Sequence, residues 1–196
     1  MKKIIGLTGP SGAGKSTAAK AFLSCGAHVL DGDIVARRVV EKGMPALSEL
    51  TDAFGADVLL PNGELDRKKM AEIAFSTPEN LHKLNSITHK YIIAEIKQEI
   101  KDSAKTVFVI DAAALFESGL DGICDATVAV TANKESRLAR IMARDKLSAH
   151  EAEARISAQP KDDFYVLKSR YHIENDGDAA ALSRFVSCIL KEVECE

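Results

Sequence analysis

The residues best suited to chemistry in this chain stand in the short run GPSGAGKST, from Gly9 to Thr17. The run fits the spacing G-x-x-x-x-G-K-[ST], whose fixed positions are occupied by Gly9, Gly14, Lys15 and Ser16. Glycines let backbone N–H groups turn inward around a polyphosphate, because a Cβ would obstruct that approach. The lysine adds a positive charge for the outer phosphates, and the serine hydroxyl can bind Mg²⁺.

The run therefore predicts a loop that binds nucleotide phosphates, and a plain Gly/Ser-rich turn is the alternative. The predicted ATP-binding residues of the loop are Gly12, Ala13, Gly14, Lys15, Ser16 and Thr17.

A second group of candidate residues lies in LDGDIVAR, which contains Asp31, Asp33 and Arg37. In an open parallel sheet, ligands bind outside the carboxyl ends of the strands, so these residues are expected to face the phosphate loop. A hydroxyl that accepts a phosphoryl group needs a carboxylate to orient it and take its proton. Asp33 is our candidate, and the alternative is that Asp33 only caps a helix that starts at Ile34.

Asp111 closes the apolar run VFVID. A carboxylate at the end of a strand beside a phosphate loop often holds Mg²⁺, so we predict that role for Asp111. The alternative is a residue that only forms the turn after the strand. Glu117 is a weaker candidate, which fits equally well as a polar residue on a short helix.

Three arginines, Arg137, Arg140 and Arg144, follow one another at offsets of three and four and so share one helix face. The guanidinium fork matches phosphate oxygens in two-point contacts. The alternative is a solvated face whose arginines pair with Glu135 and Asp145. Because a phosphate loop lies upstream, we favour a phosphate-binding role for at least Arg140.

These candidates require a sheet that places strand ends side by side. Five short apolar runs are predicted as strands: Lys3–Leu7, His28–Leu30, Thr106–Ile110, Ala126–Val130 and Tyr171–Glu174. Helical periodicity fills most of the gaps, as a parallel sheet with crossover helices requires. The first helix is expected to begin near Lys15 and to stop at Gly26, and its N-terminus favours an anion at the loop.

The gap between the second and third strands is far longer than one crossover helix needs. Its helical patterns, including a long helix from Pro78 to Lys101, predict an inserted subdomain that holds a substrate. A second helical and heavily charged region runs from about Arg137 to Arg170. In that region, Ser148 and Glu151 have the spacing of a capping box.

Composition excludes several classes of function. The chain has 196 residues, of which 46% are hydrophobic and 28% charged, with a net charge of −3. A nucleic-acid-binding chain would favour a basic balance. No apolar stretch approaches the roughly 20 residues of a membrane span. The four scattered cysteines are typical of reduced thiols, so we expect a cytoplasmic protein with no nucleic-acid or membrane partner.

Asn133 and Lys134 resemble the start of the guanine-reading sequence N-K-x-D, but Ser136 occupies the position of its carboxylate. A signalling GTPase is therefore disfavoured. Arg67 with Lys68 and Lys69 forms a basic cluster that reads as a solvated helix face.

Taken together, these segments resemble the bacterial dephospho-coenzyme A kinases. The resemblance is carried by Gly9–Thr17, Asp31–Val40, Phe54–Arg67, Leu84–Ile93, Asp111–Leu120, Arg137–Asp145, Arg155–Gln159 and Tyr171–Gly177. It implies transfer of the γ-phosphate of ATP to the ribose 3′-hydroxyl of dephospho-CoA, with Mg²⁺, in the last step of coenzyme A synthesis.

The resemblance also implies roles for single residues. The implied catalytic residues are Asp33, Lys15 and Arg140, and Ser16 and Asp111 would hold the metal. Asn175 and Gly177 match a loop near the adenine. The substrate-binding residues would be Thr8, Asp33, Arg37, His89 and Leu115. Two departures stand out, Lys90 where the family usually has proline, and Ala112–Ala114 where it usually has Val-Pro-Leu.

The implied fold is an α/β, three-layer P-loop kinase fold with a mainly parallel five-stranded sheet, a helical substrate subdomain and a lid. One domain would span residues 1–196, as a monomer or small homo-oligomer. Its predicted parts are a core at about 1–31, 106–140 and 171–196, a CoA-binding insertion at about 32–105 and a lid at about 141–170. Two rival functions remain, a kinase for a nucleoside monophosphate or small alcohol, and an ATPase or nucleotide-dependent switch without an acceptor.

Overall fold

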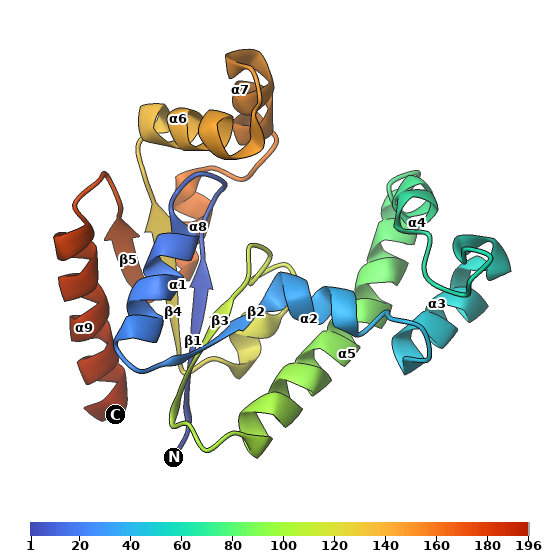
Figure 1. The fold of residues 1–196 in the computed structure, drawn as a ribbon, viewed down its shortest axis with the longest axis horizontal. Coiled ribbons are helices and arrows are strands. Elements are labelled where there is room, and N and C mark those ends of the chain that lie inside the picture. Colours follow the sequence, from blue (N-terminus) through green and yellow to red (C-terminus); the bar gives the residue numbers. More distant parts are fainter. Residues whose placement is uncertain (196) are drawn as a thin grey trace. The chain divides into compact units, whose positions relative to one another are not determined.

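The computed structural model describes residues 1–195, except for the side chain of residue 179. A five-stranded sheet has the strand order β2-β3-β1-β4-β5 (Figure 1). Its strands are β1 (Lys3–Thr8), β2 (His28–Asp31), β3 (Val107–Asp111), β4 (Ala126–Thr131) and β5 (Tyr171–Glu174). β1 pairs in parallel with β3 and with β4, and β4 pairs in parallel with β5.

The predicted α/β fold with a mainly parallel, five-stranded sheet is confirmed. All five predicted runs form strands, and Tyr171–Glu174 has the predicted bounds. Three runs end one residue later than predicted, and β3 is shifted by one residue at both ends, so that it begins at Val107 and includes Asp111. Glu196, the last residue of the predicted core, lies outside the described residues.

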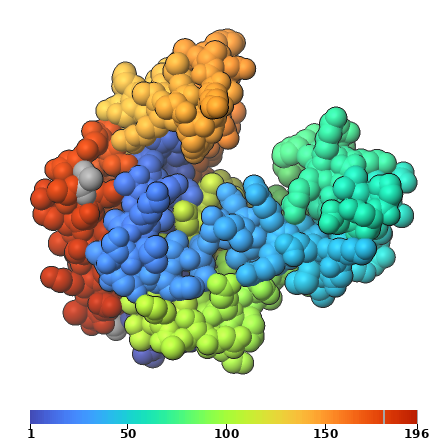
Figure 2. All heavy atoms as spheres, viewed as in Figure 1, coloured from blue at the N-terminus to red at the C-terminus, as the bar shows by residue number. Residues whose placement is uncertain are grey.

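The central strands are almost continuously apolar because helices cover both faces of a parallel sheet. All four residues from Val107 to Ile110 are buried. Helices α1 (Lys15–Ser24) and α9 (Ala179–Cys195) pack side by side on one face of the sheet, as Figure 2 also shows. α1 ends two residues before the predicted stop, and Gly26 follows with a φ of 96°, a left-handed conformation that favours glycine.

The charged region after β4 forms α6 (Lys134–Asp145), α7 (Ala149–Ser157) and α8 (Asp162–Lys168). Asn133 caps α6 by accepting a hydrogen bond from the Ser136 N–H, so this residue has a structural role. The predicted capping box is confirmed: Ser148 and Glu151 bond reciprocally at the start of α7.

The chain divides into two compact units, and Asp31–Ser103 is one of them. The other unit consists of Met1–Leu30 and the chain from Ala104 onward, and it contains most of the sheet. Among the described residues, no helix is both long enough and apolar enough to cross a membrane.

The Asp31–Ser103 unit is helical and is built around one long helix. Its helices are α2 (Gly32–Arg38), α3 (Pro45–Phe54), η1 (Ala56–Val58), α4 (Arg67–Ala74) and α5 (Pro78–Asp102). α5 contacts α2, α3 and α4. Pro78 stands in the first turn of α5, as predicted, behind the capping residue Thr77. Val58, Met70 and Ala74 form a small apolar core.

Candidate active site

The phosphate loop connects β1 to α1 and has space for glycine alone at Gly14, the second glycine of its motif. Gly14 has a φ of 94°. A Cβ there would lie 1.9 Å from Asn175 Nδ2, so a side chain at this position would displace Asn175. The loop therefore needs glycine both for its backbone conformation and for the close approach of its neighbour.

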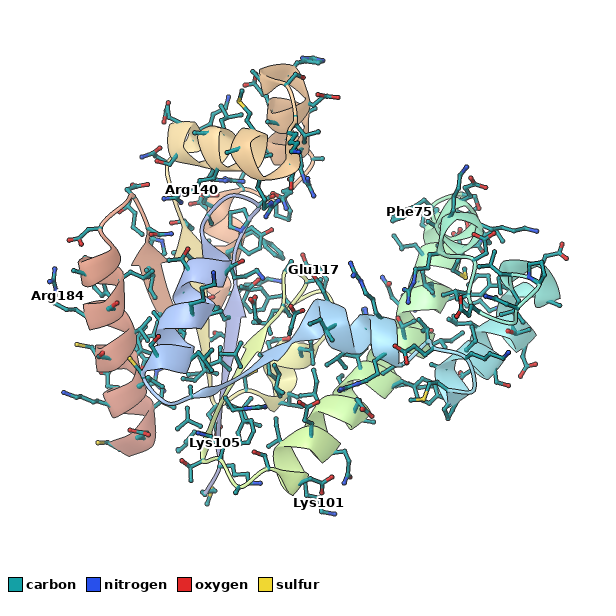
Figure 3. The ribbon with its side chains drawn as sticks, viewed as in Figure 1. Phe75, Lys101, Lys105, Glu117, Arg140 and Arg184 are labelled. Atoms are coloured by element: carbon teal, nitrogen blue, oxygen red, sulfur yellow. The ribbon has the colours of Figure 1, made fainter. Side chains whose placement is uncertain are left out.

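Side chains outside the loop hold three successive loop carbonyls. Arg140 Nη1 donates to the carbonyl oxygens of Gly12 and Ala13, each at 3.2 Å. Asn175 Nδ2 also donates to the Ala13 oxygen, at 2.9 Å. Arg137 Nε donates to the Ser11 oxygen at 3.0 Å. Figure 3 shows Arg140 on the side of α6 that faces the loop.

These contacts determine where the loop N–H groups point. In a planar trans peptide the carbonyl and the following N–H point in opposite directions. The N–H groups of Gly12 and Gly14 are therefore turned away from the arginines. The N–H groups of Lys15 and Ser16 belong to the first turn of helix α1, so no preceding helical turn supplies an acceptor for them. Together they form a site suited to an anion.

Lys15 Nζ forms an ion pair with the carboxylate of Asp111. The pairing follows from the sheet register, because Leu7 of β1 lies opposite Asp111 of β3. The side chains of Lys15 and Asp111 are only 20% and 13% exposed. The predicted metal residue thus lies beside the phosphate loop, at the end of β3.

The other predicted residues near the ends of β1 and β3 are mostly buried. Thr8 is fully buried and donates a hydrogen bond to the Ala113 carbonyl at 3.2 Å. Leu115 is also fully buried and packs against Gly6. Any contact of Leu115 with a substrate would therefore use its backbone. Glu117 is exposed in a run of turns, where a short helix was one expectation.

Asp33 and Asp31 have different structural roles. The Asp31 carboxylate accepts hydrogen bonds from the N–H groups of Asp33 and Ile34, at 2.9 and 3.0 Å. Asp31 is therefore the N-cap of α2, and the alternative interpretation of Asp33 as the cap is wrong. The Asp33 side chain is exposed in the first turn of the helix.

The Asp31–Ser103 unit contains a largely apolar cavity of about 300 Å³. Most of its lining is aliphatic, and its polar members are Arg67, Asn85, Thr88 and His89. His89 is half-buried, and burial lowers the pKa of its imidazole below the ordinary value. Arg67 is exposed, as a solvated helix face requires, and it also lines this cavity. Its guanidinium also donates to the Arg37 carbonyl at 3.3 Å.

The three arginines of α6 all contact the phosphate loop, but to different extents. Arg137 is buried, whereas Arg144 is exposed and reaches only the Ser11 hydroxyl, at 3.5 Å. Arg144 also pairs with Asp145 at 2.8 Å, and its hydrogen bond holds the pKa of that carboxyl below the ordinary value. The alternative of a solvated, paired face thus fits Arg144 alone.

Two predicted residues lie in the loop after β5. Asn175 is buried, and its carbonyl accepts a hydrogen bond from Arg140 Nη2 at 2.8 Å. Gly177 is exposed, with a φ of 122°. Asn175 therefore supports the phosphate loop.

The donor set at the loop suits Mg²⁺. Ser16 offers an exposed hydroxyl, and Asp111 offers a carboxylate that contacts the neighbouring residue, Lys15. Mg²⁺ prefers oxygen ligands and is usually held by one or two protein groups together with phosphates and waters. Within residues 1–195, no group of three or more His, Cys, Asp or Glu side chains could hold a metal by itself.

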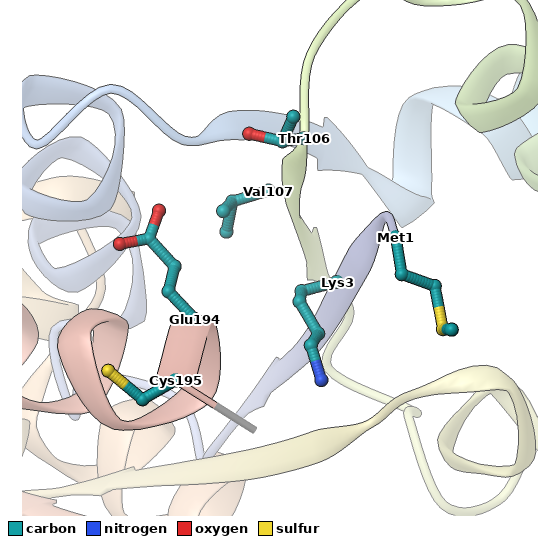
Figure 4. A pocket seen from close by; sticks show the side chains of 6 residues that line it. All are labelled: Met1, Lys3, Thr106, Val107, Glu194 and Cys195. Carbon is teal, nitrogen blue, oxygen red and sulfur yellow. The ribbon is translucent and has the colours of Figure 1, made fainter.

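A second cavity, of about 490 Å³, lies at the opposite, amino-terminal end of the strands (Figure 4). Its lining includes Lys3 of β1, Val107 of β3 and Glu194 of α9. It has no contact with the phosphate loop, so it does not contribute to the candidate site.

Comparison with known proteins agrees with this geometry. The family model described as dephospho-CoA kinase matches residues 3–181. The chain belongs to the dephospho-CoA kinase family. The predicted family is thereby confirmed, and with it the class of enzyme, a kinase.

Known proteins and solved structures match over nearly the whole chain. A dephospho-CoA kinase from Moorella thermoacetica is 41% identical over 97% of this chain and 92% of its own length. A crystal structure from Thermus thermophilus has 33% identity and a TM-score of 0.83, and covers 98% of both chains. A dephospho-CoA kinase from Campylobacter jejuni has 27% identity and a TM-score of 0.68, also over 98% of both chains.

Proposed function

We propose that this chain transfers the γ-phosphate of ATP to the ribose 3′-hydroxyl of dephospho-CoA, giving CoA and ADP. Membership of the dephospho-CoA kinase family is the observation that carries the proposal. The phosphate loop supports it, because its carbonyls are held outward and its N–H groups form an anion site beside Lys15.

In the proposed reaction, the 3′-oxygen forms a bond to the γ-phosphorus while the bond from that phosphorus to the β,γ-bridging oxygen breaks. Asp33 orients the 3′-hydroxyl and receives its proton, which its exposed carboxylate can accept. Lys15 exchanges its contact with Asp111 for the phosphate oxygens and neutralises their charge.

We propose that Ser16 and Asp111 hold Mg²⁺, supported by their oxygen donors. When bound, the metal neutralises charge on the β- and γ-phosphates. Arg140 would contact phosphate only after releasing one of its bonds to the carbonyls of Gly12, Ala13 or Asn175.

We also propose that residues 32–105 form the insertion that binds dephospho-CoA and that residues 141–170 form a lid. The cavity with Arg67 and His89 supports the first assignment, because an apolar lining with a few polar groups is typical of a ligand site. The contacts of Arg144 and Gln159 with Ser11 of the phosphate loop support the second.

We further propose a cytoplasmic enzyme with no nucleic-acid or membrane partner, either monomeric or a small homo-oligomer. The net charge of −3 and the four free cysteines support this assignment.

The experiment that tests the function follows ADP release from Mg·ATP with three acceptor conditions: dephospho-CoA, AMP and none. Stimulation by dephospho-CoA alone is the expected result. Stimulation by AMP would instead support a nucleoside monophosphate kinase, and release that is independent of an acceptor would support an ATPase. Either of those outcomes would overturn the proposal.

A further inference from the structure

Ser11 is held at both of its backbone polar groups by side chains from distant parts of the chain. Its carbonyl accepts from Arg137 Nε at 3.0 Å, and its N–H donates to Gln159 Oε1 at 2.9 Å. Arg137 Nη1 in turn pairs with Asp162 at 2.9 Å. We refer to Arg137, Gln159 and Asp162 as the Ser11 clamp.

The clamp fixes two successive peptide planes of the phosphate loop. The Ser11 N–H belongs to the Pro10–Ser11 peptide, and the Ser11 carbonyl shares its plane with the Gly12 N–H. The direction of the Gly12 N–H is therefore set by Arg137. Gly12 also packs closely against Arg137, since a Cβ built on Gly12 would lie 2.7 Å from the Arg137 carbonyl oxygen.

Stability alone does not explain the placement of Arg137. Its side chain is only 7% exposed, and Nη2 is buried without a hydrogen-bond partner among residues 1–195. Burying a charged group with an unused donor costs free energy that an apolar side chain of similar size would not. The guanidinium fork, however, can hold the Ser11 carbonyl and Asp162 at the same time, which a lysine ammonium does less rigidly.

We propose that the Ser11 clamp aims the Gly12 N–H at the phosphates of ATP, with Arg137 as the positioning residue. A hydrogen-bond donor that is already oriented costs no reordering when the charged ligand binds. Gln159 and Asp162 lie in the segment proposed as the lid, so the clamp also connects that segment to the phosphate loop. The inference rests on the proposed function only in taking ATP as the ligand of the loop.

The test compares Arg137→Lys with the wild type and with Arg184→Lys, the same change at an exposed arginine of α9 that pairs with Asp178. The dissociation constant of ATP is measured by calorimetry without an acceptor, beside the KM for dephospho-CoA and the melting temperature. Arg137→Lys is expected to weaken ATP binding by about 10-fold, the effect of losing one well-aligned hydrogen bond to a charged group. The KM of Arg137→Lys for dephospho-CoA is expected to stay near the wild-type value. For Arg184→Lys, both the dissociation constant of ATP and the KM for dephospho-CoA are expected to stay near wild type.

Gln159→Met is a second variant, and it is expected to fold because Gln159 is half-exposed. It removes the acceptor of the Ser11 N–H and is expected to weaken ATP binding a few-fold. A purely structural role would lower the melting temperature and leave the ATP constant of the folded protein unchanged. That result, or equal losses for ATP and dephospho-CoA, would overturn the proposal. A wild type that binds ATP without phosphorylating dephospho-CoA would refute the proposed function and leave the clamp testable.

Discussion

The ammonium group of Lys15 forms an ion pair with the carboxylate of Asp111, although 96 positions separate the two residues in the sequence. The pair joins the phosphate loop to the end of β3. The ion pair therefore holds the Lys15 ammonium group at the edge of the sheet where β3 ends.

Replacing Lys15 with methionine is expected to lower kcat by about 10²–10³-fold, because the variant keeps the length of the side chain and removes the charge that stabilises the migrating phosphoryl group. Steady-state kinetics with dephospho-CoA measure the effect. Lys20→Met, an exposed change in the same helix, is the control and should retain wild-type kcat. Equal activity of the two variants would contradict the role of Lys15.

Variants of Asp33 and Asp31 can separate an effect on catalysis from an effect on stability. Asp33→Asn is expected to lower kcat by about 10²–10⁴-fold, the contribution of a positioned acid–base group, with little change in the free energy of unfolding. Asp31→Ala removes the N-cap of α2 and is expected to lower the free energy of unfolding by about 1 kcal/mol. Urea denaturation and turnover assays on both variants check this division, and near-normal turnover of Asp33→Asn would refute the catalytic assignment.

His89 gives the stability a dependence on pH. Burial lowers the pKa of His89 in the folded protein below its ordinary value of 6.5. The unfolded chain therefore binds more protons in that range, and the free energy of unfolding falls as the pH drops below about 6.5. Urea titrations at several pH values across this range should show that the free energy of unfolding falls more steeply with decreasing pH for the wild type than for His89→Gln. Parallel curves would exclude a folded-state pKa shift at His89.

Cys124 should resist alkylation. Burial, with Asp121 and Asp125 nearby, raises the pKa of its thiol to about 12, so very little thiolate forms near neutral pH. The other three cysteines, Cys25, Cys188 and Cys195, are exposed. Mass spectrometry after treatment of the native protein with iodoacetamide should find those three modified and Cys124 unmodified. Denaturant should remove the protection, and prompt labelling of native Cys124 would contradict its burial.

The sequence predicted the sheet and the phosphate loop because both are local patterns. The glycine spacing before Lys15 and the apolar runs identified β1, β3 and β4 directly. The capping box at Ser148 was visible for the same reason, since its two partners stand three residues apart.

The support of the phosphate loop was not predictable in this way. Gln159 lies 148 positions from Ser11, and Asn175 lies 162 positions from Ala13, so no periodicity connects them. The arginine spacing indicated one helix face, but it could not distinguish contacts to phosphate from the contacts to loop carbonyls that Arg137 makes. The sequence allowed Asp33 to cap a helix that starts at Ile34, but the helix starts at Gly32, and hydrogen bonds to its first turn make Asp31 the N-cap.

The most direct test of the proposed reaction follows the label from [γ-³²P]ATP in the presence of dephospho-CoA and Mg²⁺. Chromatography of the products should show the label in a compound that co-elutes with CoA, formed in equal amount to ADP. Label found in inorganic phosphate, or in a phosphorylated product distinct from CoA, would contradict transfer to the 3′-hydroxyl.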